Sequence, residues 1–255
     1  MIFGYFIQTG TGLLNLLFPN SCSFCARRLD SGVCVCEECL KELEVVNDPA
    51  CERCGAPDLE LHSEYPHRAS CPHCEDLYFG FHTNKSLGIY TGRLRELIQL
   101  YKFQKRRLLF RTFVELLVAH RERYILEHDL LLPMPLSRSR YSERGFNQCQ
   151  LIAQGIAKTL GIPFFGDILQ REGHARPQSS LRSREARMAN MTDRFRVRGK
   201  WQPHIEGRNA LLFDDVMTTG ATASRCAEAL YGAGAENVDL LTLGRSLIGV
   251  APVEF

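Results

Sequence analysis

Two adjacent carboxylates, Asp214 and Asp215, stand between a run of apolar residues and a turn of threonine, glycine and alanine. The apolar run at Leu211–Phe213 predicts a buried strand, and the Ala-rich stretch after the turn predicts a helix. Small residues at a helix start let backbone N–H groups converge on an anion, and the positive end of the helix dipole favours that anion. Two acids do not bind a phosphate, so we expect them to bind a group attached to it. The vicinal hydroxyls of a ribose fit that requirement.

The same stretch resembles the phosphoribosyl pyrophosphate (PRPP) motif of type I phosphoribosyltransferases over about twelve residues. The resemblance implies that Asp214 and Asp215 are the catalytic pair that holds the ribose hydroxyls, and that Mg²⁺ accompanies PRPP. A strand end with solvated acids, followed by a surface turn, is the competing structural interpretation. The implied phosphate-binding residues are Met217, Thr218, Thr219, Gly220, Ala221 and Thr222.

Eight of the eleven cysteines form four C-x-x-C pairs within the first 80 residues. Each pair places two thiolates at the tip of a tight knuckle, and two knuckles close a tetrahedral zinc site. Taken in sequence, the pairs predict two structural zinc ions, while an interleaved pairing stays open. Cys34 and His73 lie close enough to the pairs to replace a neighbouring ligand. The two predicted sets are Cys22, Cys25, Cys36 and Cys39, and Cys51, Cys54, Cys71 and Cys74.

This cysteine pattern predicts metal binding in a reducing cytosol rather than disulfides. The first 19 residues are apolar, but they lack the basic segment and the small-residue cleavage site of a signal peptide, and Gly10 and Gly12 interrupt them. We expect Leu13–Phe18 to be an amphipathic segment that packs on the body of the protein, with membrane contact as the minority alternative. A cytoplasmic protein with no membrane span follows.

The charge is unevenly distributed along the 255 residues, although the formal net charge is only +2. Residues 1–80 carry 5 Lys/Arg against 12 Asp/Glu, whereas residues 81–255 carry 26 against 17. The cysteine pairs also stop near residue 80. We therefore predict a zinc-ribbon domain with an N-terminal amphipathic segment over residues 1–80, and a second domain over residues 81–255. The second domain is the better partner for a polyanion.

Helical periodicity extends from Tyr90 to His120, with one apolar face before a basic run and another after it. The first face holds Leu94, Leu97, Ile98 and Tyr101, and the second holds Leu109, Phe113, Leu116 and Leu117. A solvated helix face is the default interpretation of the basic run. The alternative is a surface that follows nucleic-acid phosphates, with Phe103 stacking on a base. The candidate nucleic-acid residues are Lys102, Phe103, Lys105, Arg106 and Arg107.

A second strand, loop and helix follow. Leu130–Leu132 predicts a buried strand that ends at Pro133, and apolar residues from Phe146 to Leu160 predict a helix that Gly161 stops. The loop between them is polar and carries arginines. In open parallel sheets, loops at the carboxyl ends of neighbouring strands converge on one crevice. We therefore expect this loop to lie near the two aspartates.

The Pro-x-Pro strand end, the Arg-Gly-Phe-Asn-Gln sequence at residues 144–148, the four C-x-x-C pairs and the PRPP motif occur together. Together they resemble the ComF family of competence-associated proteins, of the ComFC or GntX type, over nearly the whole chain. The resemblance implies an α/β fold with a type I phosphoribosyltransferase-like parallel sheet flanked by helices, preceded by a small cysteine-rich double zinc ribbon. It also implies a pyrophosphate loop at Arg138, Arg144 and Gly145, for which a helix N-terminus with exposed arginines is the alternative.

Residues 171–200 carry nine Lys/Arg against three Asp/Glu and no apolar period, which predicts an exposed, mobile segment. Ile162–Leu169, just before it, is a candidate strand. The resemblance implies that the segment is a flexible loop that closes over PRPP and excludes water. A disordered, solubilising loop is the alternative. The candidate residues of the flexible loop are Arg176, Gln178, Arg184 and Arg187.

Two functions from different classes follow. The resemblance implies a factor in natural transformation that handles incoming single-stranded DNA in the cytosol and binds PRPP or a phosphoribosyl ligand. The other is an active phosphoribosyltransferase that transfers phosphoribose from PRPP to an unidentified small acceptor. The implied partners are single-stranded DNA, PRPP, a competence helicase and other DNA-processing proteins. Through those partners, the cytoplasmic protein is expected near the inner face of the membrane.

Overall fold

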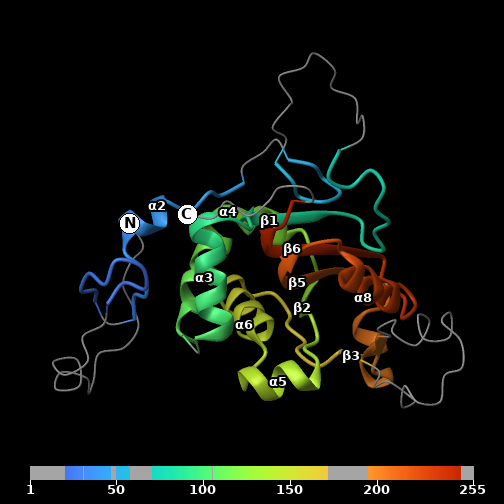
Figure 1. Cartoon of the computed structure of the whole chain (residues 1–255). Coiled ribbons are helices and arrows are strands. Elements are labelled where there is room, and N and C mark those ends of the chain that lie inside the picture. Colours follow the sequence, from blue (N-terminus) through green and yellow to red (C-terminus); the bar gives the residue numbers. More distant parts are fainter. Residues whose placement is uncertain are drawn as a thin grey trace, which may run out of the picture. The chain divides into compact units, whose positions relative to one another are not determined.

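The computed structural model of the chain describes residues 21–30, 32–46, 50–57, 71–104, 106–171 and 195–247. The chain divides into two compact units, Met1–Glu42 and Leu43–Phe255. The smaller unit contains α2 (Glu37–Lys41), and the other elements named below belong to the larger unit (Figure 1). The first four paired cysteines therefore lie in the smaller unit and the second four in the larger one. The boundary near residue 80 stays a prediction from composition.

A parallel sheet forms the centre of the larger unit, and within the described ranges it has four strands in the order β1-β6-β5-β2. Parallel strands are covered on both faces, so they need nearly continuous apolar sequence. Leu130–Leu132 and Leu211–Phe213 meet this need, with side chains at most 2% exposed. The bounds are β1 Asn84–Ile89, β2 Leu130–Pro133, β5 Asn209–Met217 and β6 Asn237–Arg245.

Strand β5 is longer than predicted, because it continues through the two aspartates to Met217 instead of ending at Phe213. Its neighbour β6 extends equally far, pairing Asp214 with Thr242 and Met217 with Arg245. The carboxylates are therefore held by a ladder of backbone hydrogen bonds rather than by a free loop.

Helices cover both faces of the sheet: α3 (Gly92–Phe103), α4 (Leu109–Leu126) and α6 (Gln148–Leu160) on one, α8 (Ala221–Tyr231) on the other (Figure 1). The chain crosses the sheet in one direction from β1 to β2 and on to Phe164, which bridges Leu131 in parallel. It returns in the opposite direction from β5 to β6. Right-handed crossovers then require α8 to lie on the opposite face.

The predicted helical span from Tyr90 to His120 is two helices, because its two apolar faces point in different directions and α3 ends at Phe103, inside the basic run. Most of the predicted inward-facing residues are confirmed. Leu94, Leu97, Ile98, Tyr101, Leu109, Phe113 and Leu117 are at most 2% exposed, and Leu116 is partly exposed.

The predicted strand at Ile162–Leu169 is represented by the single bridge at Phe164 and by the short β3, which pairs with β4 in an antiparallel ribbon. The predicted fold class, a parallel α/β sheet flanked by helices after a cysteine-rich region, is confirmed. In the part of the chain that the structure describes, no helix is both long and apolar enough to cross a bilayer. The predicted amphipathic segment Leu13–Phe18 lies outside that part. The remaining elements are α5 (Arg138–Arg144), β3 (Leu169–Arg171), β4 (Phe195–Val197) and the 3₁₀ helix η2 (Gly199–His204).

Candidate functional site

The two aspartates contact residues from two helices on the same face of the sheet. Asp215 accepts a hydrogen bond from the Gln148 amide at 3.0 Å and an ion pair from Lys102 Nζ at 2.8 Å. Asp214 lies 3.6 Å from the thiol of Cys149 and accepts the Asp215 backbone N–H at 2.8 Å. Helices α3 and α6 therefore bring one cation and two neutral donors to the carboxylate pair.

Burial raises the pKa of Asp214 to about 7, and the negative charge of Asp215 raises it further. The backbone N–H of Asp215 and the Lys102 ammonium act in the opposite direction without restoring the ordinary value. Burial likewise raises the pKa of Cys149, which therefore stays a neutral thiol. The pair consequently holds a shared proton near neutral pH, and a ligand that donates hydrogen bonds or brings positive charge will expel that proton.

The predicted phosphate-binding residues form one continuous loop at the carboxyl end of β5. Gly220 has φ +71° and caps α8, and an added Cβ there would lie 2.9 Å from the Phe79 ring. In the described ranges, the backbone N–H groups of Thr218, Thr219 and Gly220 have no hydrogen-bond partner. A small cavity of about 60 Å³ lies against this loop. It is lined by Asp214, Val216, Met217, Thr218, Thr219, Gly220, Ala221, Thr222, Ala223 and Leu240.

Arg144, a predicted pyrophosphate-loop residue, is buried at 9% exposure rather than solvated. Its Nε and Nη1 groups lack hydrogen-bond partners among the described residues, and its guanidinium lies 5.1 Å from the centre of the Phe103 ring. Gly145 follows with φ +74° and caps α5. Arg138 begins that helix, and its side chain lies outside the described atoms. A buried arginine with two idle donors is arranged to receive an anion.

The predicted nucleic-acid residues divide into two groups. Lys102 is only 12% exposed and is committed to Asp215. Phe103 is 58% exposed, and Arg106 and Arg107 are also exposed. Arg107 lies over the Phe146 ring at 4.7 Å, which joins the α3–α4 connection to the loop before α6. The predicted residues outside the described ranges are Lys105, Arg176, Gln178, Arg184 and Arg187.

The cysteines form two clusters in the predicted sequential order, and neither Cys34 nor His73 belongs to one. The first joins Cys22, Cys25, Cys36 and Cys39, and the second joins Cys51, Cys54, Cys71 and Cys74. A tetrahedral zinc ion with Zn–S bonds of about 2.3 Å needs sulfurs about 3.8 Å apart. The Cys25–Cys36, Cys51–Cys74 and Cys54–Cys71 sulfur pairs are 3.7, 3.8 and 3.7 Å apart. The geometry therefore fits two zinc sites.

The charges of the sulfurs also fit a divalent cation. A hydrogen bond from Cys54 lowers the pKa of Cys51 to about 5, while the same hydrogen bond and burial raise the pKa of Cys54. Burial raises the pKa of Cys74 to about 12. Four crowded thiols do not all ionise unaided, so a bound Zn²⁺ would supply the charge that holds them as thiolates.

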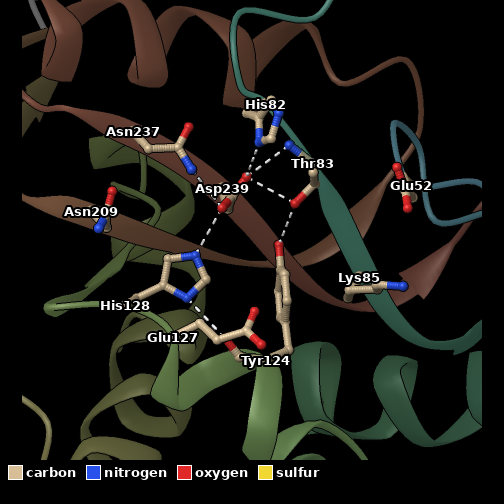
Figure 2. Close-up of a pocket in the computed structure, with 10 residues that line it drawn as sticks. All are labelled: Glu52, His82, Thr83, Lys85, Tyr124, Glu127, His128, Asn209, Asn237 and Asp239. Atoms are coloured by element: carbon tan, nitrogen blue, oxygen red, sulfur yellow. Dashed lines mark hydrogen bonds and ion pairs between the residues drawn. The ribbon is translucent and has the colours of Figure 1, made fainter.

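A larger concavity, of about 370 Å³, lies at the opposite, amino ends of the strands (Figure 2). At its centre Asp239 accepts the Thr83 N–H and hydroxyl at 2.8 Å each, the Asn237 amide at 2.9 Å and His128 Nε2 at 2.9 Å. His128 Nδ1 lies 2.9 Å from the carbonyl oxygen of Tyr124, so both ring nitrogens face acceptors. The pair is satisfied as imidazolium and carboxylate. Its groups hydrogen-bond one another and join β6, β1 and the end of α4.

Three residues near the aspartates were not predicted as site residues: Gln148, Cys149 and Arg245. Gln148 was available from the sequence as the last residue of Arg-Gly-Phe-Asn-Gln. Cys149 was identified only as part of the apolar face of a helix, which is where it lies. Arg245 carried no local signal, because its partners are distant in the sequence.

Comparison with known proteins matches residues 13–75 to the Double zinc ribbon domain. Competence protein F of Haemophilus influenzae is 28% identical over 217 residues, covering 83% of this chain and 90% of that protein. DNA utilization protein YhgH of Shigella flexneri is 28% identical over 241 residues, covering 91% of this chain and 100% of that protein. The predicted resemblance to competence proteins is confirmed.

Among solved structures, the chain is similar to adenine phosphoribosyltransferase with 19% identity and a TM-score of 0.35, covering 55% of this chain and 74% of that one. It spans 22% of the length of the allosteric regulatory enzyme of purine biosynthesis, with which it is 21% identical at a TM-score of 0.32.

Proposed function

We propose that the larger unit binds PRPP with Mg²⁺, and that the protein handles single-stranded DNA in the cytoplasm during natural transformation. One observation carries the first part. The unpartnered N–H groups of Thr218, Thr219 and Gly220 lie beside a cavity that Asp214 also lines. A phosphate on the loop would satisfy these donors, and the attached ribose would reach the carboxylate pair.

The charges around the pair support a ribose. Lys102 neutralises Asp215, so the two carboxylates accept hydrogen bonds from hydroxyls without two uncompensated buried charges. Asp214 and Asp215 offer hard oxygen donors of the kind that Mg²⁺ prefers, whereas the neutral Cys149 thiol does not suit that ion. Mg²⁺ bound with PRPP would neutralise pyrophosphate oxygens.

The DNA part rests on the names of the relatives and on the surface next to the site. One relative is named a competence protein and another a DNA utilization protein. Phe103 exposes most of its ring beside the exposed Arg106 and Arg107. An aromatic ring among arginines suits stacked bases with adjacent phosphates, without sequence preference.

Arg144 favours the second candidate, an active phosphoribosyltransferase. Its idle guanidinium donors would stabilise pyrophosphate as it leaves, and displacement at the ribose C1′ depends on such stabilisation more than on a protein nucleophile. The acceptor would be a small molecule that attacks C1′ as the C1′–O bond to pyrophosphate breaks. Release of pyrophosphate by the protein in the presence of a small acceptor is the measurement for this candidate.

Calorimetry with PRPP and Mg²⁺ tests the ligand. The parent protein should bind, and a variant carrying both Asp214→Asn and Asp215→Asn should bind at least about tenfold more weakly, since it loses charge-assisted hydrogen bonds to the ribose. Equal affinities would remove the assigned site. A gel shift with single-stranded DNA, repeated with competing PRPP, tests the partner. DNA binding no tighter than that of a neutral control protein at low salt would refute the DNA part.

A further inference from the structure

Arg245, the last residue of β6, is fully buried, yet no ion pair joins it to a carboxylate among the residues that the structure describes. Its guanidinium donates instead to backbone carbonyl oxygens. Nη1 lies 2.6 Å from the carbonyl oxygen of Thr218 and 3.3 Å from that of Met217, and it also donates to Ser246. Nη2 lies 3.2 Å from the carbonyl oxygen of His73. One buried cation therefore gathers carbonyls from distant segments.

The contacts at Met217 and Thr218 fix how the phosphate loop presents its donors. In a trans peptide the N–H points away from the preceding carbonyl. With both carbonyls directed at Arg245, the N–H groups of Thr218 and Thr219 point away from it. These are two of the three loop N–H groups without a partner in the described ranges. Arg245 thus holds the donors in the orientation that an anion requires.

The contact at His73 joins the same guanidinium to the second cysteine cluster, because His73 lies between Cys71 and Cys74. The segment after this knuckle also packs on the loop. The Phe79 ring lies 2.9 Å from where Gly220 would carry a Cβ, and a Cβ on Gly80 would lie 2.5 Å from the Ser224 carbonyl oxygen. A four-thiolate zinc site carries about −2 charge, which would also offset the buried guanidinium.

We propose that Arg245 is a positioning residue through which metal occupancy of the second cysteine cluster sets the conformation and anion affinity of the loop at residues 217–222. With the knuckle closed on its ion, the His73 carbonyl anchors the guanidinium, and the guanidinium anchors the loop. When the knuckle loses its ion, that anchor loosens and the loop N–H groups diverge. The proposal rests on the proposed phosphate site for its ligand, but the coupling itself is visible without any ligand.

Hydrogen exchange of the amides at residues 217–222 measures the coupling. Removing the metal with a chelator should speed their exchange at least about tenfold, as should Cys74→Ser, because the loop loses a charge-assisted anchor. Cys22→Ser with Cys25→Ser empties the first cluster and is the matched control, and it should leave the exchange of the loop unchanged. Metal analysis should give two zinc ions in the parent and one in each variant.

Arg245→Lys tests the residue itself. It keeps the positive charge but lacks the planar fork that reaches several carbonyls at once. The loop should then exchange at least about tenfold faster with both zinc ions retained, and Cys74→Ser should add little further effect in that background. If Arg245→Lys fails to fold, the chelator experiment on the parent decides. Unchanged loop exchange after chelation, or an equal effect of emptying the first cluster, overturns the proposal.

PRPP affinity separates this proposal from the proposed function. Arg245→Lys and Cys74→Ser should each weaken PRPP binding at least about tenfold, because the loop amides no longer converge on the phosphate. A parent protein that binds no PRPP refutes the proposed ligand, and the exchange measurement then still decides the coupling. A parent that binds PRPP with the same affinity as Arg245→Lys overturns the positioning role.

Discussion

Lys102 Nζ lies 2.8 Å from Asp215 Oδ1, and the two side chains are only 12% and 15% exposed. A lysine that sequence reasoning placed on a nucleic-acid surface thus has its charge satisfied inside the candidate site. Because the pair is largely screened from water, its partners depend on each other more than the partners of a surface ion pair do.

Replacing Lys102 should therefore affect stability and DNA binding differently. Lys102→Met should lower the free energy of unfolding by about 1–3 kcal/mol, because Asp215 keeps a buried charge without its partner. Urea denaturation measures this, with Lys102→Arg as the charge-conserving control. In DNA titrations across salt concentrations, Lys102→Met should leave the salt dependence unchanged, whereas Arg107→Met should reduce its slope by about one. A reduced slope for Lys102→Met would show that this lysine contacts phosphate after all.

Asp214 should make the protein less stable as pH rises toward neutrality. Its pKa in the fold, about 7, lies above the ordinary value of 3.8, so the folded state holds a proton that the unfolded state has lost between these values. Stability then falls from about pH 4 to pH 7. Asp214→Asn removes this term and should raise the free energy of unfolding by about 2 kcal/mol at pH 8, with little change at pH 4. Urea denaturation at both pH values measures it, and a gain that is equal at both would contradict the assignment.

Arg144 should be worth more to binding than to folding. Its buried guanidinium has two N–H groups without partners in the described ranges, so Arg144→Met should change the free energy of unfolding by less than about 1 kcal/mol, mainly through the lost contact with Phe103. The same variant should bind pyrophosphate or PRPP at least about tenfold more weakly. Arg140→Met on the exposed side of α5 is the matched control and should leave binding unchanged. A loss of stability without a loss of affinity would make Arg144 structural.

Asp239 should support stability with the opposite pH dependence. Burial raises its pKa, but hydrogen bonds from His128 and Thr83 outweigh burial and leave the pKa below the ordinary value. The carboxylate therefore contributes stability above about pH 4, and that contribution is lost as pH falls through the lowered pKa. Asp239→Asn should cost about 2–4 kcal/mol at pH 7, because His128 loses a buried partner, and less at pH 3. Glu127→Gln, at an exposed carboxylate lining the same concavity, should be nearly neutral in the same denaturation series.

The sequence predicted those parts of the fold and site that are encoded locally. The strands at Leu130–Leu132 and Leu211–Phe213 and the four cysteine pairs each carry their signal within a few residues. The loop after Asp215 does so as well, because its small residues and the helix that follows are adjacent in the chain.

The rest depended on contacts between distant segments. The partners of Asp215 come from α3 and α6, and those of Arg245 come from residue 73 and from residues 217–218. Only the crossovers of the sheet bring these segments together. The basic run illustrates the limit: its composition indicated cations but not which one turns inward, and α3 directs Lys102 to Asp215 while Phe103 stays exposed.

Strand β6 has different chemistry at its two ends, and this has an evolutionary consequence. It begins in the hydrogen-bonded network around Asp239 and ends at Arg245, beside the phosphate loop. Six residues of extended strand separate the two by roughly 20 Å. Substitutions that far apart are usually additive in free energy. Selection can therefore tune thermal tolerance at the amino end while ligand preference drifts at the carboxyl end, so descendants of this fold can acquire new substrates without first losing the ability to fold.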